Sequence, residues 1–163
     1  MVYIIDLYSK IMSNILRFLP VALLLSIALT WLYGKIFRKR EKLPFFLFCM
    51  YLVLLTGETL WGRRGVVVDT QEFIGIRQLF EDPWYVVSAV ENVVMFIPFG
   101  FLAVKVAPCI NTWQRCLAVA AAVSGSIELL QYIQHIGEAQ LIDIAANAMG
   151  AMMGWRLERF VSV

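Results

Sequence analysis

The sequence has few charged side chains. They make up 16% of its 163 residues, against about 25% in soluble domains. Apolar residues make up 61%, and the mean hydropathy is +0.75. So few charges would leave much of the apolar surface of a soluble domain uncovered. This scarcity excludes an ordinary soluble domain and predicts that lipid is the solvent of the chain.

Histidine and cysteine are scarce as well. With one histidine, three cysteines and neither an HExxH nor a CxxC pattern, the sequence predicts no metal site, no cofactor and no disulfide framework. The phosphate-binding patterns GxGxxG and GxxxxGK[ST] are also absent, and the net charge is only +2. Nucleic acid is therefore not expected as a partner.

Long apolar runs predict an all-α fold, a polytopic transmembrane helical bundle that forms a single domain over residues 1–163. About five spans are expected, near residues 15–34, 43–61, 87–107, 116–136 and 141–157. The first is expected to remain attached as a transmembrane helix, because no small-residue cleavage site follows it.

Basic residues are distributed unevenly between the predicted connections. The connection at residues 35–42 holds five of them. Together with these five, the segments on its side of the membrane hold nine basic residues, against five on the other side. By the positive-inside rule, the N-terminus is expected outside and the C-terminus in the cytoplasm. In the long connection after the second span, Phe73, Ile76 and Phe80 recur at helical spacing and predict a short amphipathic helix in the outer interface.

Polar side chains interrupt the predicted spans at a similar depth, near their outer ends. Glu128 and Gln131 share one helix face, and Asp143 and Asn147 share another. Polar groups in hydrocarbon are costly and usually have a partner or a function. We therefore expect one outward-opening polar pocket, with Arg63 facing the carboxylates. The candidate pocket and ligand residues are Asn92, Glu128, Gln131, Asp143, Asn147, Arg63, Glu91 and Glu58.

Each of these features has a purely structural alternative. The asparagines and Gln131 could join helices by hydrogen bonds worth about 0.6–2 kcal/mol each, and Glu58 and Glu91 lie near enough to the interface to be solvated. Small residues at helical spacing predict a seam of close helix contact, and a proline inside a span predicts a kink. The candidate helix-packing residues are Gly150, Gly154, Gly100 and Pro98.

The polar residues belong to two longer motifs. The first is Asn-x-x-x-Phe-x-Pro-Phe-Gly-Phe-Leu over residues 92–102. The second is Glu-x-x-Gln over residues 128–131, followed by Asp-x-x-x-Asn-x-x-Gly-x-x-x-Gly over residues 143–154. Both are similar to signatures of the VanZ-like family of small bacterial membrane proteins. The resemblance covers about residues 59–157 and is strongest over 91–157. It departs at residues 137–140, where family members commonly have an arginine and an additional aspartate and this chain has Gly-Glu-Ala-Gln.

The resemblance implies a multi-pass protein of the bacterial cytoplasmic membrane. Its name-giving members imply a role in resistance to teicoplanin, a lipidated glycopeptide that acts at the outer membrane surface. Because the carboxylates lack an accompanying nucleophile or metal set, the leading hypothesis is a non-enzymatic protein that binds a membrane lipid or a lipid-linked envelope precursor.

Two other functional classes remain open. In an enzyme acting on a lipid-linked substrate, two carboxylates would share the acid and base roles, with no catalytic residue assigned at present. A small proton-coupled transporter with so few spans would need to oligomerise. A homo-oligomer joined through Gly150 and Gly154 is the corresponding candidate assembly.

Overall fold

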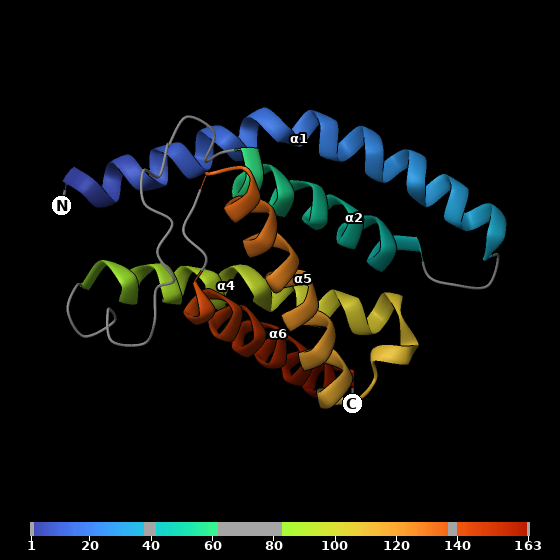
Figure 1. Ribbon diagram of the computed structural model, residues 1–163. Coiled ribbons are helices and arrows are strands. Elements are labelled where there is room, and N and C mark those ends of the chain that lie inside the picture. Colours follow the sequence, from blue (N-terminus) through green and yellow to red (C-terminus); the bar gives the residue numbers. More distant parts are fainter. Residues whose placement is uncertain (1, 38–41, 62–82, 137–139, 163) are drawn as a thin grey trace. The chain divides into compact units, whose positions relative to one another are not determined.

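The structure, a computed structural model, is built from helices and describes residues 2–37, 42–61, 83–136 and 140–162. Its α-helices are α1 (Val2–Ile36), α2 (Lys42–Thr56), α4 (Pro83–Val106), α5 (Trp113–Ile133) and α6 (Leu141–Val161), as Figure 1 shows. No strand occurs in these ranges, and the prediction of an all-α fold is confirmed. The proposed amphipathic helix near residues 73–80 and Arg63 lie outside the described residues.

A helix lies at each of the five predicted spans. Four segments of the described chain are long and apolar enough to cross a membrane, namely Ser9–Ile36, Lys42–Trp61, Tyr85–Val106 and Trp113–Ile133. The fifth helix, α6, has 21 residues, as many as α5. It carries four charged residues, against two in α5, and its buried face includes Asp143, Asn147 and Glu158.

Residues 1–64 form a compact unit in which α1 packs against α2. The first helix begins well before the predicted span and continues through Pro20. Its Tyr33 ring stacks on Phe45 of α2 with centroids 4.0 Å apart. The second helix passes directly into a π-helix, η1 (Gly57–Trp61), which contains Glu58.

Residues 65–163 form the second compact unit, in which α6 packs on both α4 and α5. Along the contact with α4, Val93 lies opposite Gly150 and Ile97 lies opposite Gly154, so the two helices run parallel. Against α5 the order reverses. Ser124 is hydrogen-bonded to Asn147. Cys116 lies earlier in α5, and its Sγ is 3.7 Å from the carbonyl oxygen of Ala151, which lies later in α6. These two helices are therefore antiparallel.

Glycines allow α4 and α6 to approach until their backbones touch. A Cβ atom added at Gly150 would overlap the carbonyl oxygen of Val93, and one at Gly154 would overlap that of Ile97. Across the same contact, a Cβ at Gly100 would overlap the carbonyl oxygen of Ala151. Small residues that permit such close contact are typical of membrane helix pairs. The small-residue face of α6 is thus occupied by a helix of the same chain.

Candidate functional site

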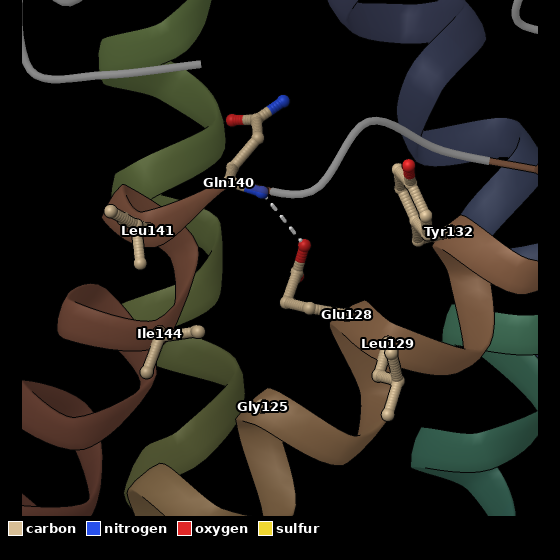
Figure 2. A pocket seen from close by; sticks show the side chains of 7 residues that line it. All are labelled: Gly125, Glu128, Leu129, Tyr132, Gln140, Leu141 and Ile144. Atoms are coloured by element: carbon tan, nitrogen blue, oxygen red, sulfur yellow. Dashed lines mark hydrogen bonds between the residues drawn. The ribbon is translucent and has the colours of Figure 1, made fainter. Parts of the chain in front are cut away.

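The start of α6 is capped by a side chain from α5. Gln140 occupies the N-cap position of α6 without a capping bond from its own side chain. Its backbone N–H instead donates to Oε2 of Glu128 at 3.0 Å, as Figure 2 shows. The first N–H groups of a helix have no partner within the helix and lie at its positive end, so a carboxylate stabilises them. Glu128 therefore holds α5 and the beginning of α6 together.

The second carboxylate lies in the first turn of the same helix. Asp143 is the third residue of α6, and its side chain is buried, with 3% of its surface exposed. Glu128 is 6% exposed. The structure thus brings two carboxylates from separate helices to one helix N-terminus. This position also provides a structural reason for burying them, because negative charge is stabilised there.

The end of α5 directs the chain back towards Glu128. His135 has a φ of 55°, the left-handed conformation that often ends helices. The N–H of Ile136 donates to the carbonyl oxygen of Gln131 at 3.1 Å, and that of His135 donates to the carbonyl oxygen of Tyr132 at 3.2 Å. These bonds form a Schellman motif. Gln131, whose carbonyl oxygen accepts one of these bonds, lies in the last turn of α5 with its side chain buried, 1% exposed.

One turn deeper, a buried hydrogen bond joins α5 to α6. Nδ2 of Asn147 donates to Oγ of Ser124 at 2.8 Å, and neither side chain is appreciably exposed. Ser124 was not among the predicted site residues. Its position four residues before Glu128 places it on the same helix face and is the signal that could have identified it.

Asn92 reaches the same level from α4. The pairs Val93–Gly150 and Lys105–Glu158 set the register of α4 against α6, and this register places Asn92 beside the second and third turns of α6, near Asn147. The side chain is 6% exposed, and its Nδ2 has no hydrogen-bond partner within the described part of the chain. Five predicted residues are therefore buried towards one end of the second unit, namely Asn92, Glu128, Gln131, Asp143 and Asn147.

The remaining candidates occupy different environments. Glu91 is half-buried on α4, whereas Pro98 is exposed on the same helix, which continues unbroken through it. Glu58 belongs to the first unit, where its Oε1 accepts a hydrogen bond from Nδ2 of Asn14 at 3.5 Å. Arg63, predicted to face the carboxylates, is outside the described residues.

A cavity of about 470 Å³ lies between α5 and α6, beside the capped start of α6. Its wall is mostly apolar, and Glu128 is the charged group among the lining residues that the structure describes (Figure 2). Leu129 and Leu141 at the cavity are more than half exposed, so in a membrane they would contact lipid. The lining residues are Gly125, Glu128, Leu129, Tyr132, Gln140, Leu141 and Ile144.

This cavity differs from the polar pocket expected from the sequence. Asn92, Asp143 and Asn147 are not among its lining residues. These three side chains are buried between the helices. Glu128 is buried at the same end of the unit and also lines the cavity. In the described ranges, no group of three or more His, Cys, Asp and Glu side chains is arranged to hold a metal ion. The arrangement suits an apolar ligand with a small polar group.

At the opposite end of the unit, charged side chains join α4 to α6. Nζ of Lys105 lies 3.3 Å from Oε1 of Glu158, which also accepts a hydrogen bond from Ser162 at 2.7 Å. Burial raises the pKa of Glu158, but the bonds from Ser162 and Lys105 and the charges of Lys105 and Arg159 outweigh it, so the pKa lies below its usual value. Glu158 was not among the predicted site residues, although it lies four residues after Gly154 on the buried face of α6.

Comparison with known proteins identifies the chain at the level of its family. Neither a curated protein nor a solved structure matches it significantly. A model of the VanZ/LLP1 family matches residues 43–162, which include both motifs and all of the site in the second unit. This match confirms the resemblance seen in the sequence. Together with the membrane-spanning helices, it shows that the chain is a membrane protein that belongs to the VanZ/LLP1 family.

Proposed function

We propose that this protein binds a membrane lipid headgroup or a lipid-linked envelope precursor in the cavity between α5 and α6. The observation that carries the proposal is the cavity itself, about 470 Å³ in volume with Glu128 in a mainly apolar wall. Small-molecule sites are commonly about 300–1,000 Å³ in volume, with apolar walls and a few polar groups that orient the ligand.

The position of the cavity favours an amphiphile over a soluble ligand. Exposed leucines at its edge, Leu129 and Leu141, would meet acyl chains in a membrane. An acyl chain that enters beside them can remain in apolar surroundings while its polar group approaches Glu128. A carboxylate can accept several hydrogen bonds at once, so it can bind such a group while it accepts the Gln140 N–H.

We further propose that this cavity faces the outer leaflet of the bacterial cytoplasmic membrane. The described basic residues of the second unit lie at its other end, on Lys105, Arg115, Arg156 and Arg159. Basic residues favour the cytoplasmic side, so this end of the unit would be cytoplasmic. The N-terminus, three spans before the end of α4, would then lie outside. Binding of an envelope lipid or precursor at the outer surface would then alter susceptibility to a lipidated glycopeptide such as teicoplanin.

A pair of leucine substitutions tests whether the cavity binds lipid. A Cβ at Gly125 would lie 4.0 Å from Cδ1 of Ile144, an ordinary contact, so Gly125→Leu can extend into the cavity without a backbone clash. Ala118→Leu adds the same side chain to an exposed position of α5 outside the cavity lining. We expect lipids bound to the purified protein, measured by native mass spectrometry, to be depleted in Gly125→Leu only. Equal retention in both variants would contradict the proposal.

The effect on susceptibility has a separate test in cells. In a strain whose teicoplanin resistance depends on this protein, Gly125→Leu should lower the inhibitory concentration and Ala118→Leu should not. Membrane levels of both variants are measured by immunoblotting. Unchanged susceptibility at normal levels of Gly125→Leu would refute the link to glycopeptides, whereas the binding experiment would still decide whether lipid is bound.

A further inference from the structure

Two arginines from different helices are attached to the short connection between α4 and α5. Nη1 of Arg115, in the first turn of α5, donates to the carbonyl oxygen of Cys109 at 3.1 Å. Nη2 of Arg159, in the last turn of α6, donates to the carbonyl oxygen of Asn111. Two residues of chain span at most about 7 Å, so both guanidinium groups are held against the same stretch of backbone.

Positive charge at this connection exceeds the negative charge that pairs with it. The described carboxylate that pairs with these bases is Glu158, whose Oε1 lies 3.3 Å from Nζ of Lys105 and whose Oε2 lies 4.0 Å from Nε of Arg159. Arg115 forms no ion pair within the described part of the chain. Three basic side chains therefore share one carboxylate. Like charges held together repel each other, so an anion bound between them would stabilise the arrangement.

Both guanidinium groups keep donors for such an anion. A guanidinium has five N–H groups, and the bond to a backbone carbonyl engages one of them in each arginine. Arg115 is exposed, and the side chain of Arg159 is 47% exposed. The carbonyl bonds also fix the two side chains, which lowers the ordering cost of binding. The planar fork of a guanidinium matches the oxygens of a phosphate.

The connection has the features of a segment at the level of lipid headgroups. It contains a 3₁₀-helix, η2 (Pro108–Ile110), and the N-cap residue of α5, Thr112. Irregular backbone that faces lipid does not occur within the hydrocarbon core. The adjacent Trp113 is 46% exposed, and tryptophan is enriched at the membrane–water interface. Lipid phosphates lie at this level, which favours a lipid over a soluble phosphate compound as the ligand.

We propose that Arg115 and Arg159 form a binding site for the phosphate of an anionic membrane lipid. This site is separate from the cavity between α5 and α6, because Arg115 and the cavity residue Gly125 are ten residues apart on α5, a distance of about 15 Å. It is also independent of the proposed function. The two arginines then have a ligand in addition to any part that they play in the orientation of the chain.

Three probes are compared for binding to the purified full chain in detergent, by native mass spectrometry. Dioctanoyl phosphatidylglycerol and dioctanoyl phosphatidylcholine have the same acyl chains but differ in net charge, and glycerol 3-phosphate lacks the chains. We expect phosphatidylglycerol to bind more tightly than either other probe. Equal binding of the two lipids would overturn the proposal. So would binding of glycerol 3-phosphate as tight as that of phosphatidylglycerol, because the ligand would then be a soluble phosphate.

A pair of glutamine substitutions separates the site from general attraction by charge. Arg115→Gln removes one guanidinium and should weaken phosphatidylglycerol binding by about tenfold or more, as expected for lost hydrogen bonds to a charged group. Arg156→Gln is the matched control, because Arg156 is exposed and lies three residues before Arg159 but has no bond to the connection in the described structure. It should change the affinity by less than about twofold. Equal losses in the two variants would refute the site.

A lysine substitution tests the site even if Arg115→Gln does not fold. Arg115→Lys keeps the positive charge, and with it the distribution of basic residues that governs orientation. The ammonium group cannot form the two parallel N–H···O bonds of a guanidinium. We expect phosphatidylglycerol binding to weaken by about threefold or more. An unchanged affinity in the folded Arg115→Lys protein would refute recognition by the guanidinium group.

Gly125→Leu distinguishes this site from the cavity. The substitution fills space about 15 Å from Arg115 along α5, so the preference for phosphatidylglycerol over phosphatidylcholine should remain. If that preference were lost in Gly125→Leu but kept in Arg115→Gln, the anionic lipid would be bound in the cavity and the assignment to the arginines would be wrong.

Discussion

Alanine at Gly150 should destabilise the bundle much more than alanine at Gly125. The added Cβ at Gly150 would overlap the carbonyl oxygen of Val93 and lie 3.1 Å from Cβ of Phe96, which is fully buried. A backbone oxygen cannot rotate away as the end of a side chain can. Relief therefore requires α4 and α6 to separate by roughly 1 Å, which forfeits about half of the dispersion energy of each contact across the seam.

The magnitude follows from two opposing terms. Overpacking costs about 1–3 kcal/mol, and the upper end applies at Gly150 because the obstructing atom belongs to the backbone. Replacing glycine by alanine inside a helix returns about 1 kcal/mol. The net loss at Gly150 is then about 2 kcal/mol. At Gly125 the nearest atom would be Cδ1 of Ile144 at 4.0 Å, so only the gain of about 1 kcal/mol remains.

The assay is the free energy of unfolding in bicelles, measured by steric trapping for the wild type, Gly150→Ala and Gly125→Ala. The two variants should differ by about 3 kcal/mol, with opposite signs relative to the wild type. If their unfolding free energies agreed within about 0.5 kcal/mol, the close approach of α4 and α6 at Gly150 would be refuted.

Three further predictions concern single positions. Gln140→Ser supplies a short capping oxygen at the start of α6, where the native side chain makes no capping bond, and should raise the free energy of unfolding by about 1 kcal/mol; no gain would contradict the N-cap assignment. His135→Gly removes the cost of a left-handed φ of 55° and should stabilise the protein by about 1 kcal/mol in the same assay; a loss would show that side-chain contacts of His135 outweigh that cost. For Glu158, the lowered pKa means that its contribution to stability is present above the unfolded value of about 4.3 and is lost as pH falls through the folded pKa. Unfolding of the wild type should therefore depend on pH below about 4.5 more steeply than that of Glu158→Gln, and identical pH profiles would exclude the ion pair with Lys105 as a stabilising contact.

The positions of the helices could be predicted because lipid imposes a strong local requirement. Apolar runs of the right length lead to helices, since backbone groups in hydrocarbon must bond within their own segment. The ends were less predictable. Helix α1 starts at Val2, before its apolar run, because polar residues can extend a helix beyond the membrane core. Helix α6 likewise continues past its predicted end to Val161.

Part of the candidate site was visible in the sequence for a similar reason. The spacing of Glu128 with Gln131 and of Asp143 with Asn147 put each pair on one helix face, and all four side chains are buried. Their partners were not visible. Ser124 accepts a hydrogen bond from Asn147, and Glu128 caps α6, whose N-cap residue Gln140 lies twelve residues later. Both contacts depend on how α5 and α6 align.

The amino-acid sequence alone determined the helical membrane fold, the family signatures and the inward faces of the polar residues, because each depends on composition or on neighbours within one helix. Only the tertiary structure decided that Glu128 meets the start of α6, that Gly150 faces Val93, and that a cavity lies beside Tyr132. These features arise from the register and separation of different helices, which the packing of the second unit sets.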